Sequence, residues 1–84
     1  MSRREKILAM LVDEPADVFL RYALALELDK EGDHEASLRK LRELAGGSPA
    51  YVPAFFMAGQ QLVHLDRIDE ARGELRAGID AARE

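Results

Sequence analysis

An internal repeat of 34 residues restricts the fold of this chain more than any other feature of its sequence. Shifting the sequence by 34 positions places residues 15–18, Pro-Ala-Asp-Val, over residues 49–52, Pro-Ala-Tyr-Val. A period of this length is typical of one supersecondary unit that stacks on copies of itself. The residues that pair in the same register include Lys6 with Lys40, Tyr22 with Phe56, Ala25 with Gly59, Leu28 with Leu62, Leu41 with Leu75 and Arg42 with Arg76.

The segments between the prolines and glycines favour helices. Alanine and leucine supply 25 of the 84 residues, whereas valine and isoleucine supply 7. Alanine and leucine lose little entropy in a helix, while strands favour β-branched and aromatic residues. No segment alternates with period two, so we predict an all-α chain of about five helices. The first helix is expected from Ser2 to about Leu11, and the second after Asp17 to about Lys30. The third is expected from Asp33 or His34 to the break at Gly46. The fourth is expected from about Pro53 to Leu65, and the fifth from Ile68 or Asp69 onward.

Residues with special backbone preferences mark the ends of the expected helices. Ser2 and Asp17 are suited to cap helix N-termini, because their side-chain oxygens can accept hydrogen bonds from the first backbone N–H groups. Gly32 can adopt a positive φ in the turn before the third helix. The run Gly-Gly-Ser-Pro at residues 46–49 breaks the chain before the fourth helix.

Small and large apolar residues recur at matching places in the two copies of the repeat. Small residues let helix backbones approach, and large ones fill the remaining space. The second copy carries Phe55, Ala58, Gly59, Leu62, Ala71, Leu75, Gly78 and Ile79, and the first carries Leu24, Ala25, Leu28, Ala36, Leu41 and Pro49. This pattern resembles the tetratricopeptide repeat (TPR) family. The first copy departs from the family pattern, because Arg21 replaces an aromatic residue and Ala36 comes one position early.

The resemblance implies an α-solenoid of antiparallel helix pairs. It implies a single TPR-like domain over residues 1–84, in which residues 2–13 form an N-terminal half-repeat helix. Residues 15–48 would then be the first repeat, and residues 49–84 the second repeat with a C-terminal capping helix. Members of the family bind peptides or other proteins and carry no chemistry of their own. The resemblance therefore implies a non-catalytic interaction module, such as a scaffold or adaptor.

The resemblance also places a partner-binding groove on the first helix of each repeat. Independent support comes from residues 18–28, which are apolar nearly all round the expected helix. If one stripe of this helix faces the core, the apolar residues Phe19, Tyr22 and Leu26 lie outside that stripe. They need a second covering surface, which is either another helix of this chain or a partner. The groove positions that the family pattern implies are Phe19, Tyr22, Leu26, Asp29, Lys30, Pro53, Phe56, Gln60, Val63 and His64.

The absence of asparagine disfavours one binding mode of the family. TPR proteins that hold chaperone C-termini by a carboxylate clamp use lysine and asparagine on the groove wall, whereas the matching positions here are mostly apolar or aromatic. We therefore expect a hydrophobic or amphipathic peptide segment as the ligand. The alternative is a structural protein that associates with itself, as a homodimer covering its own groove. Solenoids need about three repeats for stability, and this chain has two and a half.

The charge balance argues against nucleic acid as a partner. The formal net charge is −4, whereas nucleic-acid binding leaves a basic footprint. Basic residues do cluster, but beside acidic residues at helical spacing, as Arg39 lies four residues after Glu35. This arrangement favours ion-paired helix faces over an anion-binding patch.

No set of residues in the sequence matches a catalytic site, so we predict that the chain is not an enzyme and holds no metal or cofactor. His34 and His64 lie 30 residues apart, and neither has a His, Asp or Glu partner four residues away. No serine lies in an elbow motif or beside a histidine. The glycines at residues 46–47 lack the lysine of a phosphate-binding loop.

Composition also guides the expected location. The chain has no cysteine for disulfides, no apolar stretch near the ~18 residues of a membrane span, and no signal-peptide pattern at its start. We therefore expect a cytoplasmic protein without a membrane partner. Nine arginines against three lysines, with abundant alanine and glycine, indicate a GC-rich bacterial genome.

Overall fold

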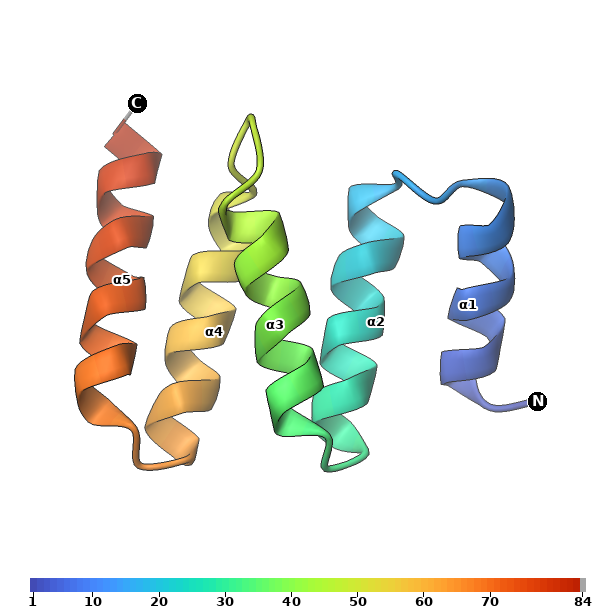
Figure 1. Ribbon diagram of the computed structural model, residues 1–84, viewed down its shortest axis with the longest axis horizontal. Helices are drawn as coiled ribbons and strands as arrows, with labels where there is room; N and C mark the ends of the chain where they lie inside the picture. Colours follow the sequence, from blue (N-terminus) through green and yellow to red (C-terminus); the bar gives the residue numbers. More distant parts are fainter. Residues whose placement is uncertain (84) are drawn as a thin grey trace. The chain divides into compact units, whose positions relative to one another are not determined.

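The computed structural model describes residues 1–83 and forms five α-helices over that range (Figure 1). The helices are α1 (Arg3–Asp13), α2 (Val18–Lys30), α3 (His34–Ala45), α4 (Val52–His64) and α5 (Ile68–Arg83). No strand occurs among the described residues, which confirms the all-α prediction. Glu84, the last residue of the expected capping helix, lies outside the described residues. Within residues 1–83 no helix is both long enough and apolar enough to cross a membrane.

Two side-chain caps and one turn glycine agree with the sequence-based predictions. The hydroxyl of Ser2 accepts a hydrogen bond from the backbone N–H of Glu5 at 3.1 Å. The carboxylate of Asp17 accepts one from the backbone N–H of Leu20 at 3.0 Å. Gly32 has a φ of +90° in the turn between α2 and α3. These local signals therefore determine where α1, α2 and α3 begin.

Helix ends that lack such a signal differ from the predictions by one or two residues. α1 continues to Asp13 rather than ending near Leu11, and α4 begins at Val52 with Pro53 inside its first turn. Asp66 adopts a φ of +59° in the turn before α5, a conformation that the sequence analysis did not anticipate. Aspartate tolerates this left-handed region better than most residues do.

The chain divides into two compact units, residues 1–40 and the residues from Leu41 onward, and the division falls within α3. In the first unit α1 packs against α2. Ile7, Leu24 and Leu28 form the buried cluster of this unit. The partly buried residues that pack against the cluster are Leu11, Ala23 and Ala36.

The apolar residues of α1 are covered only in part. Ile7, Leu8, Met10 and Leu11 recur at helical spacing and form an apolar stripe along it. Ile7 is buried and Leu11 is partly buried, four residues apart on the side of α1 that packs on α2. Leu8 and Met10 are 44% and 49% exposed. A single neighbouring helix covers only one side of α1, so half of the stripe faces solvent in this unit.

In the second unit α4 packs against α5 at positions occupied by glycine and alanine. A Cβ atom on Gly59 would lie 2.7 Å from Cδ2 of Leu75, and one on Gly78 would lie 2.7 Å from Cβ of Phe55. Ala71 is 1% exposed. The prediction that small residues permit close helix approach is confirmed for this pair.

Candidate partner-binding site

Four of the predicted groove residues form a row along α2. Phe19, Tyr22, Leu26 and Lys30 are separated by three, four and four residues, so they lie on one face of the helix. Phe19 is 75% exposed, Tyr22 and Leu26 are half-buried, and Lys30 is exposed. Leu24, Ala25 and Leu28, which lie on the other side, are buried. The first unit of the fold therefore leaves the aromatic start of this row in contact with solvent. We call these four residues the α2 row.

Four more of the predicted groove residues form a row along α4. Phe56, Gln60, Val63 and His64 are spaced at helical intervals and all are exposed, with Phe56 at 40% and Val63 at 48%. Ala58, Gly59, Gln61 and Leu62 of the same helix are buried. We call the four exposed residues the α4 row.

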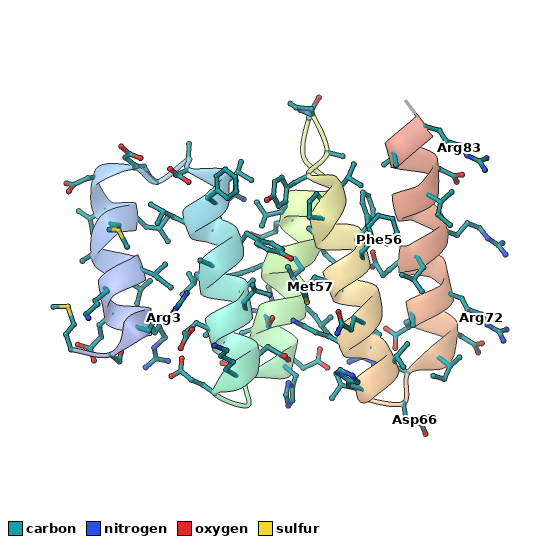
Figure 2. The ribbon with its side chains drawn as sticks, turned by 180° about the vertical axis from the view of Figure 1, so that it is seen from behind. Arg3, Phe56, Met57, Asp66, Arg72 and Arg83 are labelled. Carbon is teal, nitrogen blue, oxygen red and sulfur yellow. The ribbon has the colours of Figure 1, made fainter. Side chains whose placement is uncertain are left out.

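Phe56 is partly covered by the second unit's own last helix. A Cβ atom on Gly78 of α5 would lie 3.3 Å from Cζ of Phe56. In Figure 2, Phe56 lies on the side of α4 next to α5. Another helix of this chain, α5, therefore covers part of Phe56.

Beside Lys30, at the end of the α2 row, two side chains interact across the turn into α3. Nδ1 of His34 lies 2.6 Å from Oδ1 of Asp29, and both side chains are partly exposed. The two residues are five apart and sit on either side of the turn at Gly32. Asp29 lies on α2 and His34 on α3, so the four-residue spacing of a single helix does not predict this pair.

The first unit is also held by two ion pairs between α1 and α2. Arg3 pairs with Glu27 at 3.3 Å, and Arg4 pairs with Glu31 at 3.5 Å. The expectation of ion-paired basic clusters is confirmed for Arg3 and Arg4. Their partners lie on the neighbouring helix rather than one turn away on the same helix.

A cluster of charged side chains organises the start of α5. Arg67 donates two hydrogen bonds to the carboxylate of Glu70, at 2.6 and 2.8 Å. Arg42 of α3 donates to Glu70 at 3.4 Å and to Glu74 at 3.0 Å. The hydrogen bonds from Arg67, with a smaller contribution from Arg42, lower the pKa of Glu70 to about 2. The basic residue Arg42 therefore serves the packing of α3 and α5 within the second unit.

The described part of the chain contains no group of three or more His, Cys, Asp or Glu residues able to hold a metal ion. Ser37, one of the three serines considered as nucleophiles, is buried, and its hydroxyl donates a hydrogen bond of 2.6 Å to the backbone carbonyl of Ala25. This bond gives Ser37 a role in packing the start of α3 on α2, which the sequence did not reveal.

Comparisons of the chain with protein-family models, curated proteins and solved structures find no match in any of the three. The candidate site is therefore inferred from the spacing and exposure of its own residues. The α2 row belongs to the first unit and the α4 row to the second. That the two rows line one groove remains a prediction from the repeat.

Proposed function

We propose that this chain is a non-catalytic protein-interaction module, a scaffold or adaptor built from stacked TPR-like antiparallel helix pairs. One observation carries the proposal. Tyr22, Leu26 and Lys30 of the α2 row correspond to Phe56, Gln60 and His64 of the α4 row in the 34-residue register. Each row also exposes an apolar side chain outside the buried core, Phe19 by 75% on α2 and Val63 by 48% on α4. Exposed apolar and aromatic side chains that gather on equivalent helices are typical of protein-binding surfaces.

The chemistry of the rows favours a hydrophobic or amphipathic peptide segment as the partner. Phe19, Tyr22 and Phe56 supply aromatic surface, which is enriched at interfaces because it buries a large area with few rotatable bonds. Each row ends in a basic or titratable residue, Lys30 on α2 and His64 on α4. An amphipathic helix with an apolar face and an acidic end would match this order.

The proposal is tested by selecting helical peptides from a display library against the immobilised full chain and measuring their Kd by calorimetry. Phe19→Ser and Val63→Ser remove exposed apolar groups from the two rows. Each substitution is expected to weaken binding about tenfold, the effect of losing an interface hot spot.

The control is Val12→Ser, which removes an equally apolar side chain, 80% exposed, from α1 outside both rows. It should leave the Kd unchanged. The double variant Tyr22→Ala with Phe56→Ala should abolish binding while circular dichroism shows retained helicity. Binding that survives all of the row substitutions would show that the partner docks elsewhere.

The competing occupant of the rows is a second copy of the chain, as a homodimer that covers its own groove. Light scattering after size-exclusion chromatography separates the two alternatives. A dimer that dissociates on Phe19→Ser or Val63→Ser would favour self-association through the rows. A monomer that binds selected peptides would favour the interaction module.

A further inference from the structure

The outer face of α5 carries a row of basic and apolar side chains that the proposed groove does not use. Arg72, Arg76, Ile79 and Arg83 are separated by four, three and four residues, so they share one face of the helix. All four are exposed, Ile79 by 47%. In Figure 2 the labelled Arg72 and Arg83 point away from α4. We call these four residues the α5 basic row.

None of the three arginines in the α5 basic row makes an ion pair with another described residue. Arg3, Arg4, Arg42 and Arg67 all do. Unlike those four arginines, the three of the α5 basic row face solvent and are available to a partner.

The first unit has a hollow between the end of α1 and the start of α2 that is lined by acidic and apolar side chains. The hollow has a volume of about 210 Å³ and is lined by Met10, Asp13, Glu14 and Leu20. Met10 is 49% exposed, and Asp13 and Glu14 are exposed at the end of α1. Neither carboxylate has an ion-pair partner within residues 1–83. Typical small-molecule pockets measure about 300–1,000 Å³, so this acidic hollow suits a single large side chain better than a whole ligand.

We propose that the α5 basic row of one copy of this chain docks on the acidic hollow of a second copy. Ile79 would contact Met10 and Leu20 of the hollow, and the flanking Arg76 and Arg83 would pair with Asp13 and Glu14. Both surfaces combine apolar side chains with charges, of opposite sign, that lack partners in their own unit. This match of charge and polarity identifies a second copy as the occupant.

An interface of this kind joins two different patches, so each copy carries both halves of it. It closes into a two-fold dimer when the two contacts form reciprocally, and otherwise continues into a ring or a chain of copies. It uses no residue of the α2 or α4 row, and it does not depend on the proposed peptide-binding function. Because the contact is electrostatic and lies at the surface, it weakens as the salt concentration rises.

Charge exchange in the full chain tests the proposal. The first variant combines Asp13→Arg with Glu14→Arg, the second combines Arg76→Glu with Arg83→Glu, and the third carries all four changes. Sedimentation velocity and light scattering measure the mass as the protein concentration rises at low salt. The wild-type mass should increase beyond that of a monomer, each two-residue variant should weaken association at least about tenfold, and the four-residue variant should restore it.

The matched controls are Arg39→Glu and Glu43→Arg, which reverse exposed charges on α3 outside both surfaces and should leave association unchanged. Circular dichroism checks the helicity of every variant. If the variant with Arg76→Glu and Arg83→Glu loses helicity, the variant with Arg76→Gln and Arg83→Gln takes its place.

Three outcomes would overturn the proposal. They are a wild-type monomer up to the solubility limit, association that is indifferent to the charge reversals, and failure of the four-residue variant to restore it. Association that is lost on Phe19→Ser but kept on charge reversal would instead indicate a homodimer through the α2 and α4 rows, so the two interfaces are distinguishable.

Discussion

At the scale of single residues, the two glycines of α5 have opposite surroundings. Gly78 is buried, and a Cβ atom there would lie 2.7 Å from Cβ of Phe55. Gly73 has nothing within 4 Å of the position that a Cβ atom would take. Both glycines reduce the intrinsic stability of the helix relative to alanine, but only Gly78 permits close packing on α4.

Alanine substitutions at these two positions should therefore change stability in opposite directions. Gly78→Ala is expected to destabilise the fold by about 1–3 kcal/mol, because a Cβ atom attached directly to the backbone of Phe55 cannot move aside cheaply. Gly73→Ala should stabilise it by about 0.5–1 kcal/mol. Urea denaturation of the two variants measures both effects. A stabilising Gly78→Ala would show that α4 and α5 are less closely packed than described.

At the scale of elements, the two copies of the repeat start their first helices by different means. α2 begins with the side-chain cap of Asp17. α4 begins after Tyr51, at the equivalent register position, without a side-chain cap bond, and has Pro53 in its first turn. Proline near a helix start has a φ suited to the helix and does not lose a backbone hydrogen bond there. The two copies therefore begin this helix at the same register position, but with different residues at the helix start.

The cap of α2 predicts the effect of removing it. Asp17→Ala should lower stability by about 1 kcal/mol, because the backbone N–H of Leu20 loses its acceptor. Asp17→Asn is the matched control, since asparagine caps about as well as aspartate and loses only the charge, and it should stay within about 0.5 kcal/mol of the wild type. Thermal unfolding compares the three proteins. Equal losses for both variants would mean that the charge of Asp17, and not its hydrogen bond, stabilises α2.

At the scale of the whole molecule, carboxylates that bind arginines join helices within each unit. The net charge is −4, yet several acidic residues are held by basic ones on another helix, such as Glu27 by Arg3 and Glu74 by Arg42. Glu70 is the most strongly affected, because two arginines donate to it. Its pKa of about 2 in the folded chain lies below the ordinary value of 4.5.

The lowered pKa of Glu70 determines how the stability of the fold changes with pH. Ionised Glu70 stabilises the fold fully above pH 4.5, and this contribution is lost as the pH falls toward about 2, where the carboxylate is protonated in the folded chain as well. Glu70→Gln should therefore be destabilised relative to the wild type near neutral pH, with a difference that shrinks over this acidic range. Urea denaturation at a series of pH values measures the difference.

The partner of Glu70 supplies the control for this pH effect. Arg67→Gln should remove most of the same pH dependence, because its hydrogen bonds are the largest cause of the lowered pKa. A difference between Glu70→Gln and the wild type that stays constant from neutral to acidic pH would contradict this assignment.

Local signals in the sequence predicted much of the fold. The five helices, the caps at Ser2 and Asp17 and the turn at Gly32 depend on residues within a few positions of one another. The spacing of the α2 and α4 rows could also be predicted, because helical periodicity places such residues on one face. At the end of α1, which has no side-chain cap or glycine, the helix continues two residues beyond the expected end near Leu11.

What the sequence by itself determined is therefore the helical content, most helix starts and the faces that share apolar residues, because these follow from backbone preferences and a period of 3.6 residues. Only the tertiary structure decided which of those faces are covered. In the folded chain Ser37 is buried and Leu8 is exposed. His34 interacts with Asp29, and Glu70 accepts hydrogen bonds from two arginines. Contacts between helices and across turns depend on how the chain folds back on itself, and spacing along one helix cannot reveal them.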